Sequence, residues 1–254
     1  MKLLSSIPEY EHTVLYFLKF SDSKENLEKL QKGMLYMNNL KYYIDLEKAT
    51  RYKGRGDILE ATAVMNDLTD VKLISQKTGE IIPIGNVLRM TLRRDDCIYQ
   101  PVFCTAAISS GILEIIKEND KQIEVKALFT DEQKERFPKD FGKYVLVIRA
   151  VDFVKRIQER FREKKISYIA SFIKYVDFSK NHIEQLNAFK DGALDIFFWK
   201  DISLAYQIEH RMVILNPDLK TPFIFDLGDL SGFCKLISAE EFFNEEMLIT
   251  INKD

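Results

Sequence analysis

The stretch Ser203–Asn216, with the sequence SLAYQIEHRMVILN, constrains the fold of this chain more than any other segment. Read as a strand, it points alternate side chains to opposite faces, and its even positions are mostly apolar. Its odd positions carry Gln207, Glu209 and Arg211 before they become apolar as well. A run this apolar predicts a strand in the interior of a sheet. Because residues at i and i+2 share a face, Glu209 and Arg211 stand side by side on it.

Two interpretations of this charged pair follow. Glu and Arg are rarely buried unless they are paired, so their face must open on water, on a ligand, or on each other. In the first interpretation Glu209 and Arg211 form a structural ion pair. In the second, Glu209 is a carboxylate held in a cleft for chemistry, since perturbed charges gather at functional sites. The segment alone leaves both open.

Length and composition predict a single domain over residues 1–254, or one domain with an elaborated insertion. Hydrophobic residues make up 46% of the chain, which is enough for a substantial core. The 37 basic and 39 acidic residues nearly balance, to a formal charge of −2. This balance argues against a general nucleic-acid or membrane binder.

The cysteine pattern bears on the compartment. Cys97, Cys104 and Cys234 form no CxxC pair and have no histidine at ligand spacing, so we expect neither a disulfide framework nor a zinc site. The first residues hold too short an apolar stretch for a signal peptide, and no segment reaches the roughly 18 apolar residues of a membrane span. We therefore expect a cytoplasmic protein with no membrane partner and no metal.

Periodicity predicts an α+β fold with a mixed or antiparallel β-rich core and several short amphipathic helices. The expected strands are Thr13–Phe20, Met34–Leu40, Ala61–Met65, Val71–Ser75, Ile81–Ile84, Cys97–Ile108, Ile123–Phe129, Lys143–Arg149, Ser167–Phe178 and Met247–Ile251. The expected helices follow possible caps at Asp22, Thr130, Ser179 and Ser238, and another covers Asp152–Lys165. Asn86–Asp96 fits no element clearly.

The most basic loop of the chain, Lys48–Gly56, runs directly into Asp57 and Glu60. Its two glycines and its cations, Arg55 among them, are suited to holding a phosphate, although most loops of this kind are simply solvated. The basic face of Asp152–Lys165 offers the same choice between a solvated face and a nucleic-acid contact. The chain has no Walker or GxGxxG pattern.

Several short blocks occur in a characteristic order: TVLYFLKF, GMLYMNNLKYYIDLE, RGDILEA, PVFCTAAIS, KYVDF and FFWKDISLAYQIEHRMVIL. In this order they resemble a broad group of uncharacterised bacterial proteins. That group has an "LYKY"-like opening strand, a G-x-L-(Y/W)-(F/A)-(N/S) strand, an acidic D-x-x-E element, an (F/Y)-C-(F/L)-(S/T) strand and a late Y-x-x-E-x-R strand. No single block is specific, and their order carries the resemblance.

The group is in turn similar in layout to ADP-ribosyltransferase-like folds. This resemblance implies NAD as the substrate, with Glu209 on the late strand as the catalytic carboxylate. It places Lys19 at the early-strand position, where those folds usually carry His or Arg, and Thr105 near the nicotinamide. From the chemistry of the residues, we also expect Tyr36, Arg55 and Arg211 to contact the cofactor, and Asn38, Asp57 and Glu60 to bind the substrate. We expect Glu209, Arg211 and Lys19 to face one open pocket, with the Arg55–Glu60 element beside it.

Three classes of function stay open at this point. One is an ADP-ribosyltransferase-like or NAD-cleaving bacterial effector, of the toxin or phage-defence type, which acts on a small-molecule nucleotide and on an undefined protein or nucleic-acid target. Another is a non-catalytic binding or regulatory module in which the same charges are structural. The last is a metal-dependent nuclease built on Asp57, Glu60 and Glu209, although the chain has no PD…(D/E)xK spacing.

Overall fold

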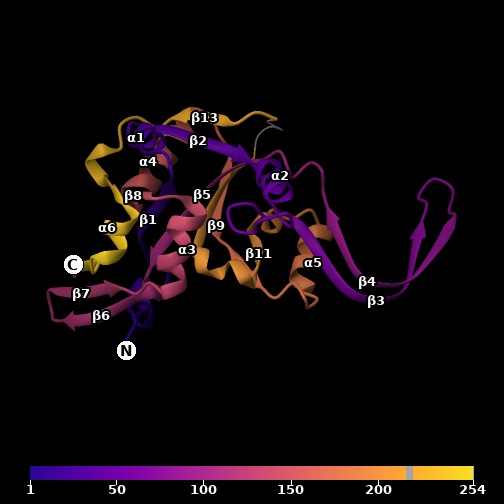
Figure 1. Cartoon of the computed structure of the whole chain (residues 1–254), viewed down its shortest axis with the longest axis horizontal. Helices are drawn as coiled ribbons and strands as arrows, with labels where there is room; N and C mark the ends of the chain where they lie inside the picture. The colour runs from indigo at the N-terminus through magenta and orange to yellow at the C-terminus, as the bar shows by residue number, and fades with distance from the viewer. Residues whose placement is uncertain (216–219, 254) are drawn as a thin grey trace. The chain divides into compact units, whose positions relative to one another are not determined.

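The computed structural model describes residues 1–215 and 220–253, and the chain divides into two compact units. The first unit consists of Met1–Asn39, Pro101–Phe172 and Tyr206–Asp254, and the second of Leu40–Gln100 and Ile173–Ala205. The second unit is thus made of two insertions into the first. Figure 1 labels the elements of both units.

The first unit is built on an eight-stranded sheet, in which β12 and β9 join a path ordered β13-β2-β5-β1-β8-β14. Its strands are β1 (Val14–Ser21), β2 (Met34–Asn39), β5 (Pro101–Ser109), β8 (Tyr144–Arg149), β9 (Tyr168–Phe172), β12 (Glu209–Ile214), β13 (Phe223–Asp226) and β14 (Cys234–Ser238). β1 lies between β5 and β8, β8 between β1 and β14, and β12 between β5 and β9. The three most apolar predicted strands are therefore interior strands, as expected.

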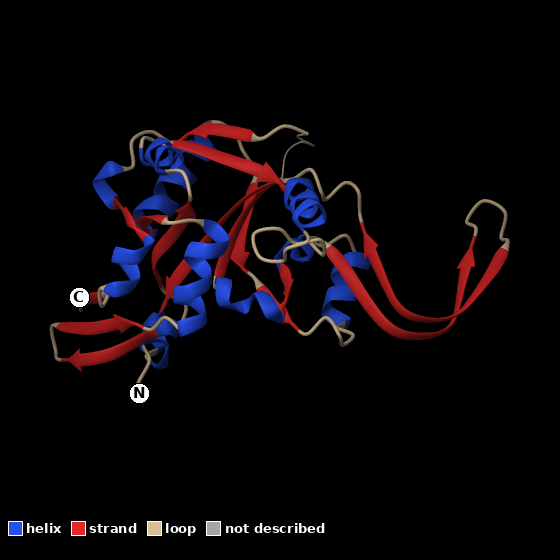
Figure 2. Ribbon diagram, viewed as in Figure 1, coloured by secondary structure: helices blue, strands red, loops and turns tan. Residues whose placement is uncertain are grey.

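Helices cover both faces of this sheet, as the ribbon view shows (Figure 2). The helices are α1 (Lys24–Gln31), α3 (Asp131–Phe141), α4 (Ala150–Glu163) and α6 (Ala239–Asn244). α1 and α4 enclose one apolar cluster with Phe17 and Leu146, whereas α3 and α6 enclose the other with Leu18 and Val145. A second, three-stranded sheet of β6 (Leu113–Glu118), β7 (Gln122–Ala127) and β15 (Leu248–Asn252) contributes to the second cluster. The predicted α+β fold with antiparallel sheets is confirmed.

The helix caps test the sequence prediction locally. The Thr130 side chain accepts from the backbone N–H of Gln133 in a complete capping box, and Ser238 caps α6, both as expected. The cap predicted at Asp22 is wrong. α1 is capped by Ser23, whose Oγ accepts from Asn26 N at 3.3 Å. Here a neighbouring serine competes for the same position.

The second unit contains α2 (Leu40–Thr50), α5 (Ile183–Lys190), the parallel pair β10 (Lys174–Val176) and β11 (Trp199–Asp201), and the hairpin of β3 (Thr62–Ile74) and β4 (Ile81–Arg93). α5 begins after His182, so the predicted cap at Ser179 is wrong as well. The two strands expected on either side of Asp67 are one strand, β3, whose register shifts near Asp67 and Asp70, both at positive φ. β4 ends at Arg93 and so covers most, but not all, of Asn86–Asp96, the segment that the sequence left unassigned.

Three predicted strands have different bounds. The segment from Cys97 begins as a strand only at Pro101, and the segment Ser167–Phe178 is divided between β9 and β10, which belong to different units. Residues Ile202–Gln207 form a 3-10 helix, so the central strand starts only at Glu209. Asn216, the last residue of that predicted strand, lies outside the described residues. The sequence did not predict α2 or β6.

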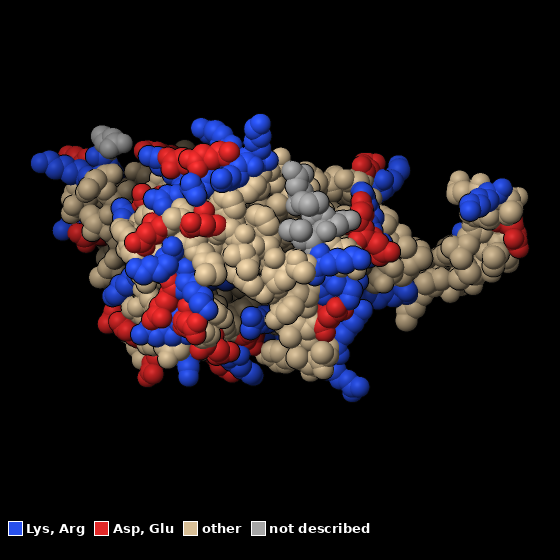
Figure 3. Space-filling view, turned by 90° about the horizontal axis from the view of Figure 1, so that it is seen from above, with Lys and Arg blue, Asp and Glu red and all other residues tan. Residues whose placement is uncertain are grey.

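Charged residues of both signs are interspersed on the face of the molecule shown in Figure 3. On α4, Arg160 pairs with Glu163 at 2.7 Å, which fits the solvated interpretation of the basic face of this helix. Within the described ranges, none of the helices combines the length and the apolar character that crossing a membrane requires.

Candidate functional site

The register of the main sheet decides which predicted site residues share a face. Ala106 of β5 pairs with Leu18 of β1 and with Glu209 of β12, so these three side chains point to the same side. Leu18 and Ala106 belong to the apolar cluster under α3 and α6. Glu209 therefore points to the α3/α6 face, and so does Arg211, two residues further along the same strand.

Lys19 and Thr105 point to the opposite face, under α1 and α4. Thr105 is paired with His210, and Lys19 with Leu146 of the α1/α4 cluster. The Lys19 ammonium donates to the Cys104 carbonyl at 2.7 Å and lies 4.6 Å from the centre of the Phe103 ring. The Lys19 side chain is thus bound to the backbone of β5 on the α1/α4 side of the sheet.

The expectation that Glu209, Arg211 and Lys19 face one open pocket is therefore wrong, and Thr105 lies on the face of Lys19. The physical reason is the two-residue period of a strand: each of these side chains is fixed to a face by its position in the register. The resemblance aligned the residues by their order along the chain, and this order does not tell to which face of the sheet a side chain points.

Two other predicted residues do share the face of Glu209. Val102 pairs with both Asn38 of β2 and Val213 of β12, so β2 and β12 flank β5 and these side chains point the same way. Tyr36 lies two residues before Asn38 and donates to its Oδ1 at 3.5 Å. Asn38 lies two strand spacings, about 10 Å, from β12. We call the residues Tyr36, Asn38, Glu209 and Arg211 the β2–β12 face.

Glu209 and Arg211 form an ion pair within the strand. The Arg211 Nε donates to Glu209 Oε1 at 2.8 Å, and Glu209 and Arg211 are only 5% and 1% exposed. The sequence left open whether these two charges face water, a ligand or each other, and in the structure they pair with each other. Buried charges of this kind are stable only with matched partners.

The backbone before Glu209 is strained. Ile208 has a φ of 40°, a conformation that a β-branched residue rarely adopts and that costs on the order of 1–3 kcal/mol. This kink separates the 3-10 helix Ile202–Gln207 from the strand. Glu209 is thereby the first strand residue after a strained junction, an arrangement that is common at functional sites.

A polar network that the sequence did not reveal holds this junction. The Tyr206 hydroxyl donates to Asp140 Oδ2 at 2.5 Å, and the Gln133 amide donates to the Tyr206 carbonyl at 3.1 Å. The Arg136 guanidinium stacks on the Tyr206 ring at 3.8 Å. Burial and the bond to Asp140 raise the pKa of Tyr206. Only the Y-x-x-E spacing pointed to Tyr206, and nothing in the sequence pointed to its partners on α3.

His210 lies beside this junction but points to the other face. Its ring contacts Phe17 at 4.8 Å and Phe172 at 5.4 Å between ring centres. Burial lowers the pKa of His210 to about 4, against the opposing charge of Glu209. The imidazole is therefore neutral at physiological pH and packs as a partly buried aromatic ring.

The second unit contains a separate cluster of charges. Asp57 and Glu60 are 1% and 2% exposed, and the ammonium of Lys200, 4% exposed, lies 3.7 Å from Glu60 Oε1. Burial, and then the charge of Glu60, raise the pKa of Asp57 to about 6, against the smaller effect of Lys200. The two carboxyl groups that we expected to bind substrate are thus together, and Lys200 is a partner that the sequence did not predict.

The basic loop has a different surrounding from the one expected. Lys53 pairs with Asp201 at 3.0 Å and donates to Ser203 Oγ at 2.9 Å, whereas Arg55 is exposed. Gly56 is packed so closely on α2 that an added Cβ would meet the backbone of Glu47. Arg55, Asp57 and Glu60 belong to the second unit, and their proximity to Glu209 stays a prediction.

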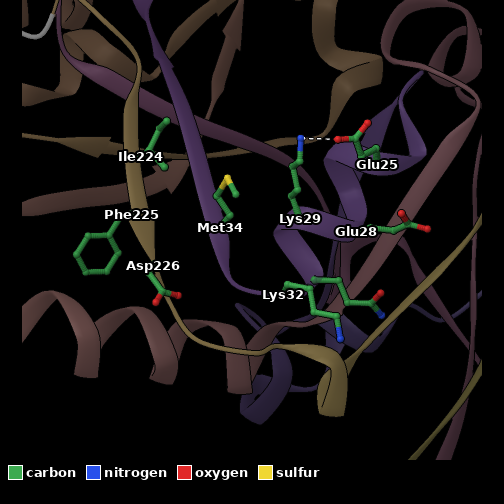
Figure 4. Close-up of a pocket in the computed structure, with 9 residues that line it drawn as sticks. Glu25, Glu28, Lys29, Lys32, Met34, Ile224, Phe225 and Asp226 are labelled. Carbon is green, nitrogen blue, oxygen red and sulfur yellow. Dashed lines mark ion pairs between the residues drawn. The ribbon is translucent and has the colours of Figure 1, made fainter.

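A groove of about 810 Å³ lies on the first unit between α1, β2 and β13 (Figure 4). Met34, Ile224 and Phe225 form its apolar part, and Glu25 pairs across its edge with Lys29 at 2.6 Å. The groove borders the β2–β12 face, because Met34 lies two residues before Tyr36 on β2 and Ile224 pairs with Tyr36.

Among the described residues, no group of three or more His, Cys, Asp or Glu side chains is arranged to hold a metal ion. Comparisons with protein-family models, with curated proteins and with solved structures found no match to this chain.

Proposed function

We propose that this protein is an ADP-ribosyltransferase-like or NAD-cleaving enzyme in which Glu209 is the catalytic carboxylate and the β2–β12 face binds the dinucleotide. The observation that carries the proposal is the register, which gives Glu209, Arg211, Asn38 and Tyr36 one common face. In this version of the ADP-ribosyltransferase-like layout, Lys19 and Thr105 have no direct contact with NAD.

The chemistry requires one well-placed carboxylate. Cleavage breaks the bond between the ribose C1′ and the nicotinamide nitrogen, and the electron pair leaves with neutral nicotinamide. The positive charge that develops on the ribose is stabilised by the Glu209 carboxylate, which also accepts a hydrogen bond from the 2′-hydroxyl. Water, or a nucleophile on a target, then forms the new bond to C1′ and gives up its proton.

The surroundings of Glu209 fit this role. Arg211 orients the carboxylate through its 2.8 Å hydrogen bond, and the strained Ile208 fixes where the strand begins. Tyr36 is 49% exposed and offers a ring on which a base can stack, and Asn38 offers an amide for the sugar or for the carboxamide.

The test is release of nicotinamide from NAD by the purified protein, alone and with added RNA, DNA or protein extract. Glu209→Gln keeps the shape of the side chain and removes its charge, so we expect a loss of about 10²-fold or more. Thr105→Val is the matched control, because it alters the same sheet on the opposite face, and its turnover should stay near that of the parent protein.

A non-catalytic binding module is the second candidate, and one observation favours it: the two charges of the pair already satisfy each other in the interior. If nicotinamide is not released under any of these conditions, or if Glu209→Gln turns over NAD as fast as the parent, the enzymatic proposal is wrong. A lowered melting temperature with unchanged turnover would identify the pair as structural.

A further inference from the structure

The charge cluster of the second unit lies outside the β2–β12 face and has no role in the proposed NAD chemistry. It joins residues far apart in the sequence: Asp57 and Glu60 precede β3, Lys53 follows α2, and Lys200 is on β11. Asp57, Glu60 and Lys200 are buried together, with the partly exposed Lys53 nearby, and this calls for an explanation, because burying charge is unfavourable unless each group finds a partner.

One atom of this cluster lacks a partner. Asp57 Oδ1 accepts from the backbone N–H of Leu59 at 2.8 Å, but Oδ2 is buried and has no hydrogen-bond partner among the described residues. Buried side-chain oxygens are almost always hydrogen-bonded. An unpaired carboxylate oxygen in a residue that is 1% exposed is therefore a place where a donor from a ligand fits.

The charges around Asp57 narrow the class of ligand. The carboxyl groups of Asp57 and Glu60 face Lys200, and the charges of Lys53 and Arg93 also act on the cluster. Because these cations balance the carboxylates, a metal cation is a poor fit. A neutral donor, such as a sugar hydroxyl, fits Asp57 Oδ2 without adding charge.

The outer part of the loop differs from its interior. Arg51 and Arg55 are exposed, whereas Gly54 and Gly56 are buried. Guanidinium groups bind phosphate through two parallel hydrogen bonds. The loop therefore offers carboxylates on the inside, which can accept hydrogen bonds from sugar hydroxyls. It offers guanidinium groups on the outside, which can bind the phosphate of the same ligand.

The backbone on either side of Asp57 and Glu60 is strained. Arg51 has a φ of 56° and Ala61 a φ of 48°, so the segment between them begins and ends at left-handed, strained residues. Strained residues of this kind are common at ligand-binding sites.

We propose that Asp57, Glu60 and Lys200, with Arg51 and Arg55 of the loop, form a binding site for a phosphorylated sugar. In this site Asp57 Oδ2 accepts a hydrogen bond from a sugar hydroxyl, Glu60 and Lys200 bind a neighbouring hydroxyl, and the two arginines bind the phosphate. The site is assigned on the second unit alone and does not depend on NAD turnover.

Proton linkage gives the proposal a distinctive signature. A hydroxyl that donates to Oδ2 favours the ionised form of Asp57, and burial raises the pKa of this group to about 6 in the ligand-free protein. Ligand binding then releases a proton below that pH. From about pH 7 down to pH 5, the affinity for the ligand should fall about tenfold. The midpoint of this change is set by the other charges that act on Asp57, which are Glu60, Lys200, Lys53 and Arg93.

Calorimetric titration of the full chain with ribose 5-phosphate tests the site, with ribose and inorganic phosphate as separate probes. We expect Asp57→Asn to weaken ribose 5-phosphate binding about tenfold or more and to abolish its pH dependence. Arg55→Met should reduce the affinity for ribose 5-phosphate and leave that for ribose unchanged. Asp70→Asn, an exposed carboxyl on the hairpin of the same unit, is the matched control and should bind like the parent.

Three results would overturn the proposal. The first is no binding of ribose 5-phosphate up to about 10 mM, well beyond the range of a specific site. The second is binding that Asp57→Asn, shown to be folded by its melting curve, leaves intact. The third is that inorganic phosphate binds the parent as tightly as ribose 5-phosphate does, which would identify an adventitious anion only.

Discussion

Glu209 of the first unit and Asp57 of the second are both acidic residues in the interior, 5% and 1% exposed, yet they are held in different ways. Glu209 has a guanidinium partner two residues away on the same strand. Asp57 lies in a loop, and one of its oxygens has no hydrogen-bond partner in the part of the chain that the structure describes. Its nearby positive charges are Lys200, from a distant part of the unit, and Lys53. The two carboxylates are thus similarly buried, but Glu209 forms an ion pair with Arg211, whereas one oxygen of Asp57 lacks a hydrogen-bond partner among the described residues. We call Glu209–Arg211 the closed pair.

The difference between Glu209 and Asp57 shows that the local backbone structure decides whether a buried carboxylate has a charged partner nearby in the sequence. Along a strand, residues at i and i+2 always share a face, so a Glu-x-Arg sequence provides its own ion pair wherever the strand lies. A loop has no such period, so the surroundings of Asp57 are set by tertiary packing. The first arrangement suits a carboxylate that must stay oriented, and the second suits one that gains or loses a proton near pH 6.

The largest expected effect is on the closed pair. Arg211→Met removes the Nε donor and leaves the Glu209 carboxylate in the interior, so we expect a loss of about 3–5 kcal/mol in the free energy of unfolding. Lys200→Met should cost less, because the distance from its ammonium to Glu60 is longer, 3.7 Å. Urea denaturation of both variants gives the comparison. Equal losses, or a loss under about 1 kcal/mol for Arg211→Met, would mean that the two regions do not differ as described.

A smaller effect of opposite sign is expected at Asp57. Its pKa is raised from 3.8 to about 6, so it contributes stability below pH 4 that is lost as the pH rises through 6. The loss at neutral pH corresponds to about 3 kcal/mol. Asp57→Asn, which cannot ionise, should therefore be more stable than the parent at pH 7 and no more stable at pH 4. A variant that is less stable at pH 7 would contradict the account of this cluster.

His210 provides a third test, because its linkage runs the other way. Burial lowers the pKa of His210 from 6.5 to about 4, so its neutral form stabilises the fold above pH 6.5 and this contribution is lost as the pH falls toward 4. We expect about 1–2 kcal/mol over this range, since the ring is half-buried and water screens part of the effect. The slopes of Asp57 and His210 oppose each other in the parent protein. In His210→Phe only the contribution of Asp57 remains, so the free energy of unfolding should fall as the pH rises. In Asp57→Asn only the contribution of His210 remains, so the free energy of unfolding should rise with pH. Parallel pH profiles of the two variants would show that neither group is perturbed as described.

Part of this picture could be predicted from the sequence. The interior strands, the capping box at Thr130 and the pairing of Glu209 with Arg211 follow from local periodicity and spacing, which need no knowledge of the partner strands. The face assignment of Lys19 and Thr105 could not be predicted, because a shift of one residue in register moves a side chain to the other side of the sheet. Lys200 could not be connected with Glu60 either, since the 139 intervening positions include a long path through the first unit. The strand predicted at Tyr206 failed because an alternating pattern over so few residues also fits a 3-10 turn.

The central claim is that the β2–β12 face, and not the face of Lys19 and Thr105, binds NAD. The most direct measurement is the affinity for NAD of Asn38→Ala beside that of Thr105→Val, determined by calorimetry on variants with parental melting temperatures. The account predicts binding about tenfold weaker for Asn38→Ala, the effect of one lost hydrogen bond, and unchanged binding for Thr105→Val. Weaker binding for Thr105→Val with parental affinity for Asn38→Ala would contradict it.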